Sequence, residues 1–289
     1  MHSVKRSGFF GKFVIPRLLK MRFYRYFLSY FPRNCVTSDK PLSVVIPLAV
    51  KDIYKAGIAV SSIRKHVKHP INEIVIVGQD HDDIRDFCAA NNLIYINEND
   101  VLPRAAFESN PNNHKKIKPS NWVYQQIIKL SVFDFINADA ILVHDSDTYL
   151  MRDITFFCGD RQILFLADEY TKKYEKLLLY FLGPIKRHRR SFVTHSMLLQ
   201  RKFLASLNNK VRENCGLSLV DAILHKIEAA NSGALSEFEI YGNFITSFHQ
   251  DAVKTRYWYN KKISPNTKIP LERLESRFWN MNTISAHEH

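Results

Sequence analysis

Glycine is scarce in this chain, with only nine among 289 residues. The sequence contains no GxxxxGK[ST] phosphate-binding loop, no GxGxxG dinucleotide fingerprint and no GxSxG turn bearing a serine nucleophile. Such sites use glycine because the backbone must turn tightly or pass close to the ligand. The sequence therefore gives no support to P-loop, dinucleotide or elbow-type serine hydrolase chemistry.

Cysteine is also sparse, and its spacing excludes a common kind of site. Cys35, Cys88, Cys158 and Cys215 lie far apart in the sequence and form no CxxC pair. Structural zinc sites are built from such close pairs, and small secreted domains carry denser cysteine frameworks. We therefore expect reduced cysteines that serve in packing, as in a cytoplasmic protein.

Long apolar runs are missing, and acidic residues are missing from the N-terminal segment. No uninterrupted stretch approaches the roughly 20 residues that span a bilayer, and no signal-peptide core with a small-residue cleavage site is evident. The first 35 residues contain eight Lys or Arg and no Asp or Glu, interspersed with aromatics. We expect residues 1–38 to form a membrane-surface segment or, alternatively, a helix that docks on the main domain.

The net charge of +13 is concentrated in two segments. The second, residues 170–190, has seven Lys or Arg against the single Glu175, and the remainder of the chain is close to neutral. Localised positive charge favours an anionic surface over nucleic acid as the partner. We expect residues 170–190 to form a basic flap that contacts an acceptor or membrane, or else a solvated loop.

Short aliphatic runs alternate with helical patterns in the first half of the chain. Strands are expected at residues 42–48, 73–78 and 93–96, and helices at 53–67 and 82–91, the latter capped by Asp82 or Asp83. This alternation predicts an α/β fold with a mostly parallel sheet flanked by helices. A loop over 99–119 and a helix over 122–136 lead to a buried strand at 140–144. Later strands are expected at 162–167, 191–199, 255–259 and 282–286, and a helix at 218–230.

The most informative motif is Asp145-Ser146-Asp147, directly after that buried strand. In an extended segment, side chains two apart point the same way. Two carboxylates at the carboxyl end of a parallel strand could hold Mg²⁺ or Mn²⁺ beside a phosphate-bearing ligand. The alternative is a capped turn in which Asp145 binds backbone amides.

Other candidate residues lie near the ends of expected elements. Pro47 and Asp52 follow the first strand and Gln79 the second, where a doubly wound sheet offers a nucleotide cleft. Lys129 could reach a diphosphate from one face of the 122–136 helix, a face that it shares with Trp122, Gln125 and Gln126. Those three residues are more typical of a packed core, as is a lone histidine such as His195.

Glu237 and Glu239 are candidates for a general base. If the segment is extended, both carboxylates face one way. If Ser236 caps a helix, Glu239 occupies the third helical position of a capping box and only Glu237 remains for chemistry. We favour Glu237 as the working residue.

Four features occur in a fixed order: a strand ending at Pro47, the helix carrying Lys129, the turn 144–147 and the segment 236–242. Together they resemble a family of bacterial GT-A-type glycosyltransferase-like proteins linked to surface polysaccharide or lipopolysaccharide synthesis. The resemblance covers roughly residues 40–289 and implies one GT-A-like domain over 39–289. It also implies metal-dependent transfer of a sugar from a nucleotide sugar to an anionic glycolipid or cell-surface glycan, at the inner face of the cytoplasmic membrane.

The same resemblance suggests a third metal ligand, because GT-A enzymes usually take one from a late histidine. His287 is the candidate here, with His249 as the other choice. Two alternatives stay open. One is a non-catalytic adaptor that binds anionic glycan or membrane. The other is a haloacid-dehalogenase-type phosphatase, although that motif has Thr or Val four positions after its first aspartate, where this chain has Tyr149.

Overall fold

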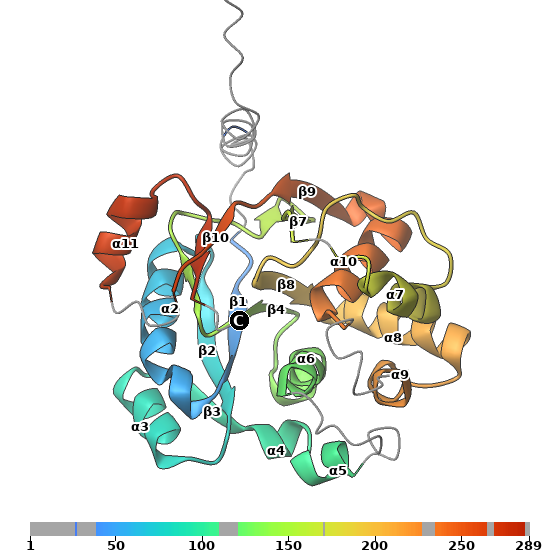
Figure 1. Ribbon diagram of the computed structural model, residues 1–289, viewed down its shortest axis with the longest axis horizontal. Coiled ribbons are helices and arrows are strands. Elements are labelled where there is room, and N and C mark those ends of the chain that lie inside the picture. Colours follow the sequence, from blue (N-terminus) through green and yellow to red (C-terminus); the bar gives the residue numbers. More distant parts are fainter. Residues whose placement is uncertain are drawn as a thin grey trace, which may run out of the picture.

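The computed structural model describes Phe27 and residues 39–109, 121–169, 171–226, 235–264 and 269–286 (Figure 1). Apart from Phe27, the basic segment 1–38 lies outside the described residues, and so does His287. None of the helices in the described ranges is long and apolar enough to cross a bilayer.

A five-stranded sheet forms the centre of the molecule, in the order β3-β2-β1-β4-β8. The first four are mutually parallel, and β8 runs antiparallel to β4. Val44 of β1 pairs with Ile74 on one side and Leu142 on the other. The predicted mostly parallel α/β sheet is confirmed, with strands β1 (Leu42–Leu48), β2 (Ile71–Gly78), β3 (Ile94–Asn97), β4 (Ala140–His144) and β8 (Ser196–Gln200).

Helices cover both faces of this sheet (Figure 1). Val44 and Ile46 of β1 pack with α2 (Ile53–His66) and α3 (Asp82–Ala90), whereas Val45 belongs to the core on the opposite face. Because side chains alternate along a strand, an apolar strand such as β1 supplies both cores. The second face is covered by α6 (Asn121–Ser131), η3 (Val132–Phe135), α7 (Tyr174–Leu182), α8 (Arg201–Cys215), α9 (Leu219–Lys226) and α10 (Glu237–Phe248).

Two small sheets complete the described part. In one, β11 (Thr283–Ser285) pairs antiparallel with β5 (Thr148–Leu150) and parallel with β10 (Asn260–Lys262). In the other, β7 (Arg161–Leu166) lies between β6 (Phe157–Cys158) and β9 (Val253–Tyr257). The first sheet matters for the site, because the register places Ser285 opposite Thr148, one residue after Asp147. The remaining helices are η1 (Val50–Asp52), α4 (Glu98–Val101), α5 (Arg104–Glu108), η5 (Gln250–Ala252) and α11 (Leu271–Phe278).

Several local predictions need correction. The expected loop over 99–119 includes most of α4 and all of α5, while residues 110–120 lie outside the described ranges. Helix α3 begins at Asp82, so its N-cap residue is His81 and not Asp82 or Asp83 as expected. The His81 Nδ1 accepts the Asp83 backbone N–H at 3.2 Å. The expected strand at 191–199 begins only at Ser196.

The basic segment 170–190 contains a packed helix. Leu177, Leu178 and Phe181 of α7 are buried in the core next to α10 and α8. Apolar residues at helical spacing account for this burial, and most of the basic residues lie before or after the buried turns. The part of this segment that follows the helix is therefore short. It begins after Gly183, which ends α7 with φ at 74°.

Candidate active site

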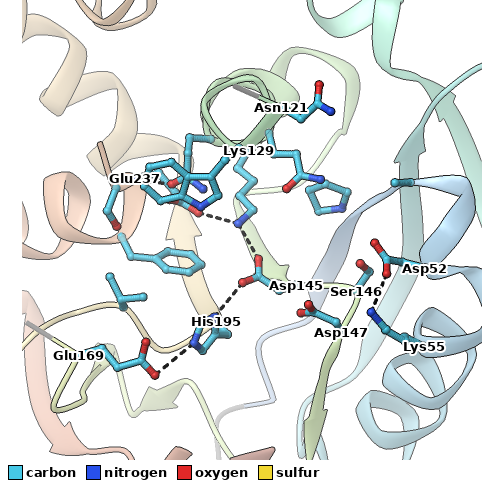
Figure 2. A pocket seen from close by; sticks show the side chains of 18 of the residues that line it. Asp52, Lys55, Asn121, Lys129, Asp145, Ser146, Asp147, Glu169, His195 and Glu237 are labelled. Atoms are coloured by element: carbon cyan, nitrogen blue, oxygen red, sulfur yellow. Dashed lines mark hydrogen bonds and ion pairs between the residues drawn. The ribbon is translucent and has the colours of Figure 1, made fainter. Parts of the chain in front are cut away.

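A cavity of about 560 Å³ lies at the carboxyl ends of β1 and β4 (Figure 2). Its walls come from the segment after β1, from α6, from the turn after β4, from the segment before β8 and from the start of α10. Seven of the candidates named from the sequence line it: Pro47, Asp52, Lys129, Asp145, Ser146, Asp147 and Glu237.

The Asp145-Ser146-Asp147 motif forms a turn. The Thr148 N–H donates to the Asp145 carbonyl at 3.1 Å, and the Asp145 N–H donates to the His195 carbonyl at 3.0 Å. The expected extended geometry is therefore wrong in detail. Both aspartates nevertheless line the same cavity, where Figure 2 shows them side by side.

Five charged side chains of alternating sign run through this site, here called the charged chain: Glu237, Lys129, Asp145, His195 and Glu169 (Figure 2). The Lys129 Nζ donates to Asp145 Oδ1 at 2.6 Å and to Glu237 Oε1 at 2.7 Å. His195 Nδ1 lies 3.0 Å from Asp145 Oδ2, and its Nε2 lies 3.5 Å from Glu169 Oε1. The side chains of Lys129 and Glu237 are 3% and 1% exposed, so this pair is buried.

The two cations and the central carboxylate hold one another in their charged forms. Burial alone would lower the pKa of Lys129, but Asp145 and Glu237 outweigh it and hold the pKa above its ordinary value. Burial would raise the pKa of Asp145, yet Lys129 and His195 hold it well below its usual range. For His195, burial is again outweighed, and bonds to Asp145 and Glu169 raise the pKa to about 9. At neutral pH, Lys129 and His195 are therefore cationic and Asp145 is ionised.

The two ends of the charged chain differ. Burial raises the pKa of Glu237, with Lys129 opposing the shift. At the exposed end, His195 outweighs burial and lowers the pKa of Glu169 to about 2. Glu237 is therefore the carboxylate of this site that takes up a proton more readily.

His195 and Glu169 line the cavity, although neither was selected as a candidate from the sequence. His195 has φ at 61°, in the left-handed region that non-glycine residues rarely adopt. In this conformation its carbonyl accepts the Asp145 N–H and its ring meets the Asp145 carboxylate. A positive φ of this kind at a cavity residue indicates a conformation imposed by its surroundings. The available signal for Glu169 was its place two residues after the end of the strand expected at 162–167.

The start of α10 separates the two glutamates. Ser236 caps the helix and its Oγ accepts the Glu239 N–H at 3.3 Å, so the capping alternative is confirmed. Helical residues two apart point in different directions. The Glu239 carboxylate accepts from Ser191 Oγ at 2.5 Å and from the Phe192 N–H at 2.8 Å, and it does not line the cavity. The structure thus corrects the expectation that Glu239 is a catalytic candidate and gives it an anchoring role.

The other predicted positions are divided between two hollows. Gln79 lies outside the main cavity and lines a neighbouring one of about 50 Å³, which includes Pro47 and Gln125 of the main cavity in its wall. On α6, Trp122 is 38% exposed at the main cavity. Gln126 accepts the Glu237 N–H at 3.1 Å and so fixes the start of α10.

The turn offers part of a site for a divalent metal. Asp145 and Asp147 are hard oxygen donors of the kind that suit Mg²⁺ and Mn²⁺. Among the described residues, no three His, Cys, Asp or Glu side chains are grouped to hold an ion. The Ala286 N–H donates to the Asp147 carbonyl at 2.8 Å, which brings the end of β11 to the turn. His287, the predicted third ligand, follows Ala286 in the sequence and lies outside the described residues.

The cavity is lined by equal numbers of cations and carboxylates. Four lysines and the cationic His195 face five carboxylates. Two of these charged groups also pair with each other, since the Lys55 Nζ lies 2.9 Å from Asp52 Oδ1. An incoming diphosphate would therefore need further positive charge, which a divalent cation would supply.

Comparison with known proteins gives a family and a set of distant structural likenesses. Residues 39–289 match the model of a family described as a "Family of unknown function (DUF6492)". No curated protein matches the chain. In overall arrangement it is similar to mouse xyloside xylosyltransferase 1, with 12% identity, a TM-score of 0.43, and coverage of 86% of this chain and 98% of that one.

Two further likenesses are of the same strength. The galactosyltransferase LgtC, in complex with donor and acceptor sugar analogs, has 12% identity and a TM-score of 0.44 over 86% of this chain and 87% of that one. The bifunctional WbbM glycosyltransferase has 13% identity and a TM-score of 0.48 over 87% of this chain and 46% of that one. The chain thus matches less than half of WbbM. Likenesses of this strength say nothing about function. The function is therefore inferred from the cavity alone.

Proposed function

We propose that this chain, which belongs to the DUF6492 family of unknown function, is a glycosyltransferase that moves a sugar from a nucleotide sugar to a glycolipid or cell-surface glycan. One observation supports this above the others. Asp145 and Asp147 line a single cavity at the carboxyl end of β4, with the Lys129 ammonium bonded to both Asp145 and Glu237. In open α/β sheets, ligands bind at this edge.

The donor would lie with its nucleoside near the end of β1 and its diphosphate near the turn 145–147. Pro47, Asp52 and Ser146 line the cavity there. Asp147 and Asp145 would hold Mg²⁺ or Mn²⁺, with His287 proposed as the third ligand; when bound, the ion would offset the charge of the leaving diphosphate. Lys129 has three N–H donors and uses two on carboxylates, so one remains for a donor oxygen.

The transfer exchanges one bond at the anomeric carbon for another. The bond from this carbon to the diphosphate oxygen breaks, and its electron pair leaves with the diphosphate. The acceptor hydroxyl oxygen forms the new bond, and its proton passes to the Glu237 carboxylate. Burial raises the pKa of Glu237, which makes it a stronger base than an exposed glutamate, while Lys129 opposes the shift.

The remaining members of the charged chain position these groups. His195 and Lys129 bind opposite oxygens of the Asp145 carboxylate, so its plane is fixed before a ligand arrives. Glu169 holds the other nitrogen of the His195 ring. Such fixed dipoles and charges stabilise a transition state without reorganising at the moment of reaction.

A binding panel tests the proposal. The protein is heated with Mn²⁺ or Mg²⁺ and each of a set of nucleotide sugars, and release of nucleoside diphosphate is measured in parallel. We expect one nucleotide to raise the melting temperature only when metal is present, and to be turned over.

Two outcomes would contradict this proposal. Stabilisation by acidic lipid vesicles alone, with no response to any nucleotide, would favour the non-catalytic adaptor. Metal-dependent hydrolysis of an aryl phosphate without use of a nucleotide sugar would favour the phosphatase.

A further inference from the structure

A second hollow of about 1080 Å³, here called the cationic groove, lies next to α10 and apart from the candidate active site. Its lining comes from two stretches and a strand end: the segment that follows α7, the carboxyl end of α10, and the end of β7. The lining residues are Leu166, Asp168, Pro184, Ile185, Lys186, Arg187, His188, Arg189, Arg190, Thr246, Ser247, Phe248 and Gln250.

The groove has charge of one sign. Four Lys or Arg line it against the single carboxylate of Asp168. That carboxylate is already engaged, because it accepts from the Tyr257 hydroxyl at 2.7 Å and lies 3.5 Å from the Arg190 guanidinium, which stacks over the Tyr257 ring. Burial lowers the pKa of His188, so its imidazole is neutral at physiological pH and adds no charge.

Not all of the basic residues are engaged within the protein. Arg187 lies 2.7 Å from Glu175 on α7. Lys186 and Arg189 are exposed, and neither has an ion pair or a side-chain hydrogen bond to any residue in the part of the chain that the structure describes. Both are therefore available to an anionic ligand.

The wall of the groove also contains a hydroxyl that has no partner in the described part of the chain. The Ser247 hydroxyl oxygen is buried in the groove wall and has no hydrogen-bond partner among the described residues. Buried hydroxyls are nearly always satisfied, because leaving one unpaired costs about 1–3 kcal/mol. A ligand oxygen in the groove could pair with this hydroxyl only after a change of the Ser247 rotamer, because the oxygen itself is not accessible to solvent.

The groove and the active-site cavity share a wall. Asp168 lines the groove and the next residue, Glu169, lines the cavity. Likewise Arg190 lines the groove and Val193 the cavity. An antiparallel bridge between Ala167 and Ser191 joins the two segments of this wall.

The wall is firmly attached to α10. Glu239 binds Ser191 and Phe192, as described above, and the Phe192 ring lies directly over Gly242. A Cβ at Gly242 would lie 2.3 Å from that ring, so glycine permits this close contact. The end of the segment that carries the basic residues is thereby attached to α10.

We propose that the cationic groove binds a phosphate group of the acceptor, so that the substrate class is a phosphate-bearing glycan. This inference rests on the proposed function, since it concerns the acceptor of that reaction. Arginine and lysine donors form strong charge-assisted bonds to phosphate. A discrete anionic group can bind inside a concave groove, whereas a flat lipid surface would contact only the rim of the groove. The exposed Phe248 in the groove offers a face for the adjoining sugar.

The test measures binding of mannose 6-phosphate and of neutral mannose by calorimetry, without donor or metal. The wild-type protein is compared with the double variant Lys186→Ala/Arg189→Ala. The matched control is Lys202→Ala/Arg212→Ala, which removes two exposed basic residues of α8 that line neither hollow. We expect the groove variant to lose at least about tenfold in affinity for the sugar phosphate, and the control to lose less than about twofold.

Two results would overturn the assignment. One is that both variants and the wild type bind mannose 6-phosphate with equal affinity. The other is loss of binding to vesicles containing an anionic phospholipid with unchanged binding of mannose 6-phosphate, which would identify a membrane as the occupant. The nucleotide-sugar donor is absent from this binding assay. A negative result therefore does not affect the nucleotide-sugar panel, and the two proposals can fail independently of each other. Once a donor is known, the groove variant should raise the acceptor KM and leave kcat nearly unchanged.

Discussion

The active-site cavity and the cationic groove use charge in opposite ways. In the cavity, cations and carboxylates are equal in number, and the buried members are bonded to one another. In the groove, four basic side chains face one carboxylate, and two of the four have no partner among the described residues. Internally paired charges fix a geometry, whereas unpaired charges attract a ligand. On the two proposals, the cavity orients its ligand and the groove binds one by charge attraction.

The largest effect should come from breaking the pairing in the cavity. In Lys129→Met, the carboxylates of Asp145 and Glu237 lose their shared cation inside the protein. Removal of one partner from a buried ion pair costs about 3–5 kcal/mol, so we expect a loss of this size in the free energy of unfolding, measured by urea denaturation. Lys55→Met is the control, since Lys55 is more exposed and its single ion pair within the described residues is with Asp52. Equal losses in the two variants would contradict the account.

The two glutamates of α10 offer a sharper contrast, because they lie two residues apart and face different regions. We expect Glu237→Gln to reduce sugar transfer by about 10²-fold or more with little change in groove binding. Glu239→Gln should instead destabilise the protein by about 1–3 kcal/mol and weaken binding of mannose 6-phosphate, because the wall beside the groove loses its anchor. Transfer assays and thermal melts of both variants check this. If Glu239→Gln reduced transfer and Glu237→Gln weakened binding of mannose 6-phosphate, the roles of the two glutamates would be exchanged.

The pH dependence of stability should reflect His195. Its pKa is raised from 6.5 to about 9 in the folded protein by Asp145 and Glu169, against the effect of burial. The stabilisation is therefore complete below pH 6.5 and declines as the pH rises through 9, by an amount on the order of 3 kcal/mol. Melting temperatures from pH 6 to 9.5 should fall for the wild type and fall less for His195→Gln. Parallel curves would show that His195 is not held as a cation.

The smallest effect should be that of salt. The basic residues of the groove are exposed and interact with a ligand through solvent, so added salt screens them. Between about 0.05 and 0.5 M salt we expect the affinity for mannose 6-phosphate to fall several-fold. The buried pair of Lys129 and Glu237 is shielded from ions, so the stability difference between Lys129→Met and the wild type should change little.

Much of the fold was accessible from the sequence because short apolar runs and helical patterns are local. The parallel sheet and the place of Asp145 at its edge follow from such runs. The role of His195 was not accessible, since it depends on a positive φ and on pairing with a residue fifty positions earlier. Spacing alone could not decide between an extended segment and a helix start at Ser236, so Glu239 remained a candidate until its partners were known. The charge around 170–190 likewise obscured the buried face of α7.

The proposed function requires that Asp145 and Asp147 serve a metal-dependent sugar transfer from one cavity. It is tested most directly by release of nucleoside diphosphate from the stabilising nucleotide sugar, measured with and without Mn²⁺ for the wild type and Asp147→Asn. We predict turnover that requires the metal and falls at least about 100-fold in the variant, while the variant still folds. Equal turnover by the two proteins, or turnover indifferent to metal, would contradict it.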